Sequence, residues 1–309
     1  MNDSKAGTNF VSEAFELTAL VFRLAKQRPE YCEKPNEFNE VYLNSLRDTF
    51  ESFEKHRAVE YAKNLTESSG VAYCAVARLA THLTKSGDTF ALRSNLDFLL
   101  EHNQWTMDAA AEFARVLNIF YKETGFADFF RANEEYFQKI SESFTVNVYS
   151  KLNKQWFDRH NLNLSNFHPI IAPSLSSSIY GTILYGDSPQ DMVICPVIAV
   201  QGDLDDILEV LYVVVHEISH AIGNPLAEKW LAENDEFRIL CEEAEKPPNY
   251  ISALNIAYEY VTRAYTILYM LENEDEDLLP ILLDAEEHMG FSRIKEVFDM
   301  LKAYLEATK

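Results

Sequence analysis

The most informative segment of the chain is Val213-Val214-Val215-His216-Glu217-Ile218-Ser219-His220-Ala221-Ile222. No proline interrupts it, and Glu217 is its one acidic residue, as expected of a helix that is buried on most sides. Residues four apart lie on one face of a helix, about 6 Å apart along its axis, so His216 and His220 can direct both imidazoles at one ion. Two histidines and a glutamate would be costly in such a helix unless something paired them.

The spacing His-Glu-x-x-His indicates a catalytic zinc site. Glu217 directly follows the first histidine, where a carboxylate reaches the open coordination position of the metal rather than the metal itself. A general base must lie there to take a proton from a water molecule activated by the ion. We therefore predict one zinc ion per chain, with His216 and His220 as ligands and Glu217 as the catalytic base. The alternative is a helix that carries two satisfied histidines by coincidence.

A catalytic zinc usually has three protein ligands, so a third ligand is needed. One zinc-peptidase pattern places a histidine six residues after the second, but that position is Leu226, which cannot bind metal. Glu259 lies 39 residues after His220, as a lone carboxylate in a largely apolar and aromatic segment. A metal would supply its counter-charge, and Arg263, one turn further on, would be its outer partner. The alternative is a buried Glu259–Arg263 ion pair without metal.

The expected fold class is α+β and mostly helical. From about Phe10 to His160 the apolar residues recur at helical spacing, which predicts a helical N-terminal region over residues 1–160. Residues 161–309 are predicted to form a zincin-like region. Its expected parts are a small, edge-exposed sheet (167–200, with strands at 167–172, 178–184 and 192–200), an active-site helix (203–222) with Asp203 as N-cap, and a helical C-terminal part (228–309). Pro169, Pro173 and Pro196 should confine some strands to edges or bulges.

Composition narrows the classes of partner. The 309 residues include 27 basic and 49 acidic side chains, giving a formal net charge of −22. Such a charge repels nucleic acid and anionic membrane surfaces. Cys32, Cys74, Cys195 and Cys241 are scattered, which favours buried thiols over a disulfide framework. The N-terminal segment has neither a signal h-region nor a membrane span, so we expect a cytoplasmic protein, or a secreted or periplasmic one if a leader was removed.

At these residues the sequence resembles the gluzincin branch of the zinc metallopeptidases. More narrowly, His216-Glu217-Ile218-Ser219-His220 with Asn224-Pro225 behind it, and Glu259-Tyr260-Val261-Thr262-Arg263-Ala264, resemble an uncharacterised bacterial family known as a domain of unknown function. The segments Phe22-Arg23-Leu24-Ala25, Trp156-Phe157 and Ser178-Ile179-Tyr180-Gly181 extend the resemblance over most of the chain. The resemblance implies His216, His220 and Glu259 as zinc ligands and Glu217 as base.

The first hypothesis is a zinc metallopeptidase that hydrolyses peptide bonds in a peptide or protein substrate, with Glu217 as general base. A strand in the region 167–200 would hold the substrate extended by backbone hydrogen bonds. A further donor must stabilise the oxyanion. The candidates are Tyr180, Tyr258, Tyr260, Arg263, Tyr265 and His288. We favour Arg263 and Tyr180 among them.

Two other hypotheses stay open at this point. In one, the chain is a non-catalytic, zinc-containing binding or regulatory module that uses its helical half for recognition. In the other, the helical half dominates a purely structural protein and the motif is a coincidence. Cleavage of a peptide library separates the first hypothesis from the second, and metal content separates both from the third.

Overall fold

The computed structural model describes residues 9–26, 39–72, 74–100, 104–164, 167–175, 179–184, 193–199, 207–244 and 252–308. They belong to two compact units. The N-terminal unit comprises Met1–Lys151 and Ser165–Ile207, and the C-terminal unit comprises Leu152–Leu164 and Leu208–Lys309. The chain is mostly helical with small sheets, which confirms the predicted α+β class.

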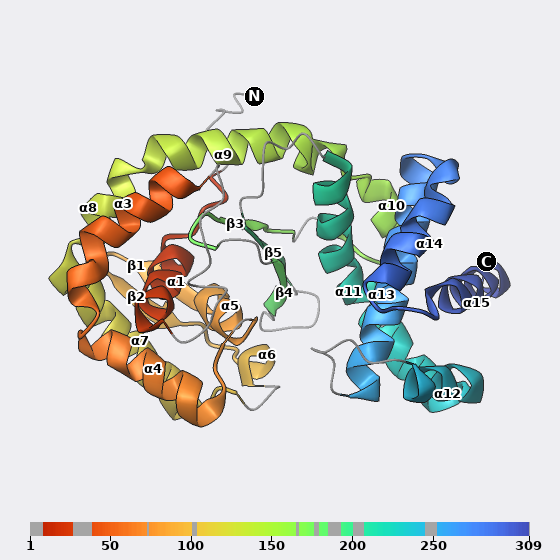
Figure 1. The fold of residues 1–309 in the computed structure, drawn as a ribbon, viewed down its shortest axis with the longest axis horizontal. Helices are drawn as coiled ribbons and strands as arrows, with labels where there is room; N and C mark the ends of the chain where they lie inside the picture. Colours follow the sequence, from red (N-terminus) through yellow and green to blue (C-terminus); the bar gives the residue numbers. More distant parts are fainter. Residues whose placement is uncertain are drawn as a thin grey trace. The chain divides into compact units, whose positions relative to one another are not determined.

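The helices of the N-terminal unit surround a hydrophobic core. They are α1 (Glu13–Ala25), α3 (Glu40–Phe50), α4 (Arg57–Ser69), α5 (Cys74–Thr81), α6 (Asp97–Leu100), α7 (Met107–Thr124), α8 (Phe126–Ala132) and α9 (Glu134–Asn147). Helix α1 packs against α4, α5 and α7 (Figure 1). Ser12 caps it by accepting a hydrogen bond from the Phe15 amide, and Phe15, Leu17 and Leu20 are buried. The helix is buried on nearly all sides, because most of its residues, including polar Glu16 and Thr18, lie in the core.

One part of this region departs from the predicted run of helices. Strands β1 (Leu83–Ser86) and β2 (Thr89–Leu92) form an antiparallel hairpin. The turn contains Gly87, whose φ of 58° lies in the left-handed region. Glycine adopts this conformation without strain, which allows two short strands to reverse over two residues.

A three-stranded sheet also belongs to the N-terminal unit. Its strands are β3 (Ile170–Ala172), β4 (Ile179–Leu184) and β5 (Val193–Ala199), close to the three predicted strands. The order is β3-β5-β4, with β3 parallel and β4 antiparallel to β5. Pro196 thus lies in the central strand. Because β3 pairs with β5 only at residues 197–199, β5 has no β3 partner at Pro196, where an amide donor is missing.

This sheet does not group with the active-site helix, as the predicted boundary at residue 160 would require. The Ile171 amide donates to the Phe10 carbonyl at 2.9 Å, and residues 11 and 171 form a parallel bridge. These long-range hydrogen bonds tie the segment to the N-terminal helices. The boundary predicted from the change in sequence pattern therefore differs from the division by contacts.

A buried carboxylate joins α1 to two other parts of the N-terminal unit. Glu16 is fully buried and accepts hydrogen bonds from the Tyr42 hydroxyl (2.7 Å) and the Ser174 hydroxyl (3.0 Å). Arg23 donates to the Ser174 carbonyl at 3.0 Å. Burial raises the pKa of Glu16 to about 7 despite these donors. Helix α1, helix α3 and residues 173–175 are therefore held together by a group that titrates near neutral pH.

The C-terminal unit is built from helices. They are α10 (Lys154–Arg159), α11 (Ile207–Glu233, whose first residue falls in the other unit), α12 (Asp235–Glu243), α13 (Ala253–Asn273), α14 (Leu279–His288) and α15 (Ile294–Ala307). Helix α13 packs against α12, α14 and α15 (Figure 1). Its residues Ile256, Ala257, Tyr260, Val261 and Ala264 are completely buried. It is the central helix of this unit.

The helix that carries the His-Glu-x-x-His motif is longer than predicted. We expected it to end at Ile222, but α11 continues through Gly223 and Pro225 to Glu233. Proline removes one helical hydrogen bond. Leu226, Ala227 and Trp230 nevertheless follow at helical spacing and are buried, so their burial favours continuation of the helix. The predicted N-cap, Asp203, lies outside the described residues.

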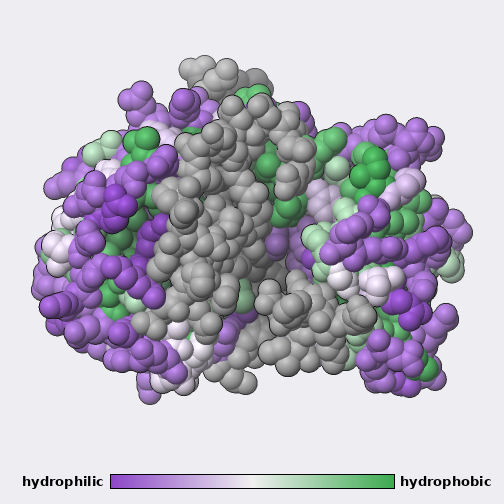
Figure 2. All heavy atoms as spheres, viewed as in Figure 1, coloured by the Kyte–Doolittle hydropathy of each residue, from purple (hydrophilic) through white to green (hydrophobic). Residues whose placement is uncertain are grey.

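On the face drawn in Figure 2, the coloured surface is largely hydrophilic, with scattered hydrophobic residues. Large apolar side chains that are strongly exposed, such as Val41, Val146 and Ile281, come from different helices. This agrees with the large excess of acidic residues. Among the described helices, none combines the length and apolar character needed to cross a membrane.

Candidate metal centre

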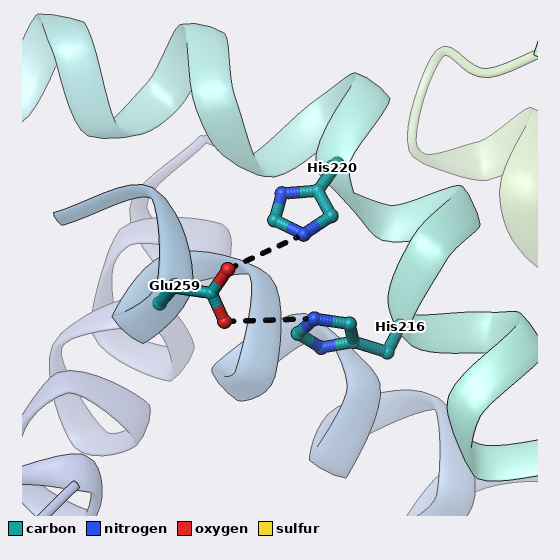
Figure 3. Close-up of side chains that lie close together, drawn as sticks. All are labelled: His216, His220 and Glu259. Carbon is teal, nitrogen blue, oxygen red and sulfur yellow. Dashed lines mark ion pairs between the residues drawn. The ribbon is translucent and has the colours of Figure 1, made fainter. Parts of the chain in front are cut away.

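Three side chains from α11 and α13 converge on one point of the C-terminal unit. Glu259 of α13 lies between the imidazoles of His216 and His220, which share one face of α11 (Figure 3). Nε2 of His216 is 3.6 Å from Oε2 of Glu259, and Nε2 of His220 is 3.7 Å from Oε1. The structure thus brings together the three residues predicted as ligands.

The separations suit a shared ion. Ligand atoms 2.0–2.2 Å from a tetrahedral zinc lie about 3.4 Å from one another, close to both histidine–glutamate distances. All three ligand atoms lie within 4.8 Å of one another, so the widest pair would have to draw closer. Two imidazoles and one carboxylate on facing helices could therefore hold a metal ion.

His220 is oriented by two polar neighbours. Its Nδ1 lies 3.0 Å from Oδ1 of Asn224, one turn along α11, and 3.1 Å from Oγ1 of Thr262 on α13. The amide oxygen of Asn224 can only accept, so it selects the tautomer with hydrogen on Nδ1. That tautomer leaves the lone pair on Nε2, the atom that faces Glu259. Hydrogen bonding of this kind is the usual support of a metal-binding histidine.

His216 is more deeply buried than His220. Burial, followed by the proximity of His220 and Arg263, lowers the pKa of His216 well below its ordinary value, so the imidazole is neutral and able to bind a metal. Its Nδ1 is buried and, among the residues that the structure describes, has no hydrogen-bond partner. The buried Ser219 hydroxyl likewise has no hydrogen-bond partner among the described residues. In His216, Nε2 therefore faces the carboxylate of Glu259, whereas Nδ1 has no partner among the described residues.

Arg263 forms an ion pair with the carboxylate of Glu259. Its Nη2 and Nε lie 3.1 and 3.2 Å from Oε2 of Glu259, and both side chains are almost fully buried. This is the ion pair that we considered as the alternative to a metal site. It coexists with the two histidines on the same carboxylate, so the pair and the proposed ligand role of Glu259 are compatible.

Glu217 follows His216 directly and is half-buried. Burial raises its pKa to about 7, the proximity of His220 lowers it, and that of Glu259 raises it again. A carboxylate with such a pKa exchanges protons near neutral pH, as a general base must.

A close crossing of helices brings Glu259 to the histidines. A Cβ atom at residue 223 would lie 2.7 Å from Oγ1 of Thr262 and 3.1 Å from its Cα and N atoms. Glycine therefore allows α11 to approach the backbone of α13 one turn beyond His220. The sequence alone does not show this contact, because it does not identify the helix that packs against residue 223.

The other predicted oxyanion donors are spread over the unit or fall outside it. Tyr180 lies in β4 of the N-terminal unit, and its side chain is outside the described structure. The Tyr258 hydroxyl donates to Glu228, and the Tyr260 hydroxyl accepts from the Arg293 amide. Tyr265 packs against His160, while His288 is exposed beside Asp284. Of the candidates whose side chains are described, Arg263 is in direct contact with a predicted ligand.

The site is thus of a two-histidine, one-carboxylate class that could hold a metal ion. Residues 16–308 match the model of the family described as a domain of unknown function, DUF4932. The match covers nearly the whole chain, which therefore belongs to this family, as the predicted resemblance to an uncharacterised family implied. Comparison with curated proteins and with solved structures gave no significant match.

Proposed function

We propose that this protein is a zinc-dependent metallopeptidase of the gluzincin type, with one zinc ion per chain. The observation that carries the proposal is the convergence of His216 and His220 on the carboxylate of Glu259 at 3.6 and 3.7 Å. The sequence motif places the two histidines on one face of α11, and Glu259 of α13 completes the set of three.

Zinc is the metal favoured by this donor set. Imidazole suits zinc and several transition metals, and a carboxylate as third ligand is typical of catalytic zinc sites with one open position. When bound, zinc supplies Lewis-acid activation of water and of the scissile carbonyl. His216 is neutral, the Nε2 lone pair of His220 is available, and Glu259 provides the negative charge.

Glu217 acts as the proton carrier in this proposal. Its position beside His216 keeps its carboxylate next to the ligands without making it one of them. It takes a proton from the attacking water onto a carboxylate oxygen and then delivers it to the nitrogen of the departing amine. Arg263 is engaged by Glu259, which favours a part in holding the ligand over stabilisation of the oxyanion.

The test is digestion of a broad peptide library by the wild-type protein and by Glu217→Gln, with zinc measured in both. We expect Glu217→Gln to keep its zinc and to lose about 10²–10⁴-fold in hydrolytic rate. Glu233→Gln, an exposed change of the same kind on the same helix, is the matched control and should retain activity.

Undiminished hydrolysis by Glu217→Gln would refute the assigned base. Zinc in the wild-type protein without cleavage of any library member would favour the non-catalytic, zinc-containing module instead.

A further inference from the structure

A second carboxylate stands behind the candidate metal centre. Glu286 of α14 is completely buried, although its neighbours Ala285 and Glu287 are exposed. One of its oxygens accepts a hydrogen bond from the hydroxyl of Tyr212, and the other from Nη1 of Arg263. A buried carboxylate is costly unless donors compensate for lost hydration, so both contacts are needed to keep it there.

Arg263 connects this carboxylate to the predicted ligand. Its Nη1 donates to Glu286, whereas its Nη2 and Nε face Oε2 of Glu259. The guanidinium carbon lies 3.9 Å from the centre of the Phe291 ring, which packs against one face of the plane. Because the guanidinium is planar, fixing one edge and one face determines where its other edge points. That other edge holds Glu259.

Tyr212 closes the network on the helix of the histidines. It lies four residues before His216 and therefore on the same face of α11. A continuous path of contacts runs from α11 through Tyr212, Glu286 and Arg263 to Glu259 on α13. The separation between the histidines and the glutamate is thus constrained by α14 as well as by the crossing of α11 and α13.

The charges support the same interpretation. Without a metal, Arg263 carries one positive charge against the two carboxylates of Glu259 and Glu286. The surplus negative charge is shared by Glu259 and Glu286, and it favours a divalent cation beside the imidazoles, which face Glu259. Loss of Glu286 would leave Arg263 and Glu259 as a neutral pair, which attracts a cation less strongly.

We propose that Glu286 is a positioning residue of the metal centre, which acts through Arg263 to orient Glu259 and to keep its negative charge available to the ion. This inference rests on the proposed metal centre and adds α14, which the sequence motif does not include. Glu286 does not contact the histidines in this account, so its effect is exerted through metal affinity and ligand geometry.

The experiment compares Glu286→Gln with Glu287→Gln, an exposed neighbour that undergoes the same change of charge. Zinc affinity is measured by chelator competition, and the absorption spectrum of the Co²⁺-substituted protein reports ligand geometry. We expect Glu286→Gln to bind zinc about 10–100-fold more weakly, with an altered Co²⁺ spectrum. Glu287→Gln should match the wild type in both measurements.

A double-mutant cycle with Arg263→Met tests whether Glu286 acts through the arginine. In the Arg263→Met background the Glu286→Gln change should weaken zinc binding by a much smaller factor. An equal weakening in both backgrounds would contradict the proposed path and assign Glu286 a merely structural part. Tyr212→Phe provides a second variant that keeps the ring, and it should weaken zinc binding in the same direction by a smaller factor.

The outcomes separate this inference from the proposed function. Wild-type affinity in a folded Glu286→Gln protein, or in Tyr212→Phe if Glu286→Gln does not fold, overturns the positioning role alone. A wild-type protein that binds no zinc overturns the metal centre and this inference together.

Discussion

The imidazole of His220 is oriented by a side chain one turn along its own helix, the amide of Asn224. At the scale of single residues, this contact predicts that Asn224→Ala weakens zinc binding by about 10–100-fold while the fold is retained. The reason is that Nδ1 loses the neighbour that can only accept a hydrogen bond. The remaining Thr262 hydroxyl can also donate, so hydrogen is no longer fixed on Nδ1 and the lone pair is no longer fixed on Nε2. Chelator competition measures the affinity, and circular dichroism checks the fold.

Asn224→Asp is the matched control, because an aspartate at this position keeps an acceptor for Nδ1. Asn224→Asp should therefore bind zinc with close to the wild-type affinity. If Asn224→Ala binds zinc as tightly as the wild type, the amide has no part in preparing His220.

The proximity of His216, His220 and Glu259 was predicted from the sequence, whereas the contacts that support these side chains were not. The His-Glu-x-x-His motif placed the two histidines on one helix face, and Glu259 was selected as a lone acid in an apolar segment. The catalytic role of Glu217 stays a prediction. Tyr212 and Glu286 are 74 residues apart and meet only through the packing of α14. The available signal for Glu286 was weak, because the surrounding residues of α14 are mostly exposed and acidic residues are common there.

At the scale of elements, the crossing of α11 and α13 depends on Gly223. In an open helix, Gly→Ala would stabilise by about 0.5–1 kcal/mol. Here the new Cβ would meet fully buried Thr262 at 2.7 Å, so we expect Gly223→Ala to destabilise by about 1–3 kcal/mol. Chemical denaturation of the metal-free protein gives the stability, and chelator competition should show weaker zinc binding.

Adding Thr262→Ala to Gly223→Ala separates the contact of the new Cβ with the Thr262 hydroxyl from its contacts with the Thr262 backbone. It removes the hydroxyl at 2.7 Å but leaves the backbone atoms at 3.1 Å, so the double variant should recover only part of the loss. A Gly223→Ala protein as stable as the wild type, with the same zinc affinity, would show that the helices separate without consequence.

Glu16 joins helix α1 to Tyr42 of α3 and to Ser174, and the raised pKa of the Glu16 carboxyl affects the stability of the fold. The folded protein holds the proton more tightly than the unfolded chain, whose pKa is the ordinary 4.5. The protonated form therefore stabilises the fold at low pH, and this contribution is lost as pH rises from 4.5 through about 7. For this fully buried group the loss amounts to about 3 kcal/mol.

The measurement is the difference in unfolding free energy between the wild type and Glu16→Gln across this range of pH. Taking the difference removes contributions from other carboxylates that titrate in the same window. The unfolding free energy of the wild type minus that of Glu16→Gln should fall by about 3 kcal/mol as pH rises. Glu40→Gln, an exposed change on α3, should give a flat difference, and a flat curve for Glu16→Gln would contradict the raised pKa.

The sequence pattern predicted some of the elements and missed others. Helices were expected between residues 10 and 160, where α1 and α7 lie, and the three strands between 167 and 200 were predicted close to their observed bounds. The hairpin of β1 and β2 was missed because four-residue strands with mostly exposed side chains leave little apolar pattern. The end of α11 was predicted at Ile222, which is too early. The helix continues through Pro225 to Glu233 because the residues that follow the proline are buried.

At the scale of the whole molecule, the fold class followed from composition and periodicity, but the grouping of elements did not. The strands between 167 and 199 follow the helical half in sequence and join it through Phe10 and Ile171. The candidate metal centre, in contrast, lies entirely within the C-terminal unit, on α11, α13 and α14. Contacts over long sequence separations decide such a division, and a local pattern does not encode them.

The central claim is that each molecule binds one zinc ion through His216, His220 and Glu259. Elemental analysis of the undenatured wild-type protein, beside His216→Ala and Glu259→Ala, tests it most directly. We predict one zinc per chain in the wild type and a loss of zinc in both variants. Absence of stoichiometric zinc from the wild type, or full zinc content in Glu259→Ala, would contradict the account.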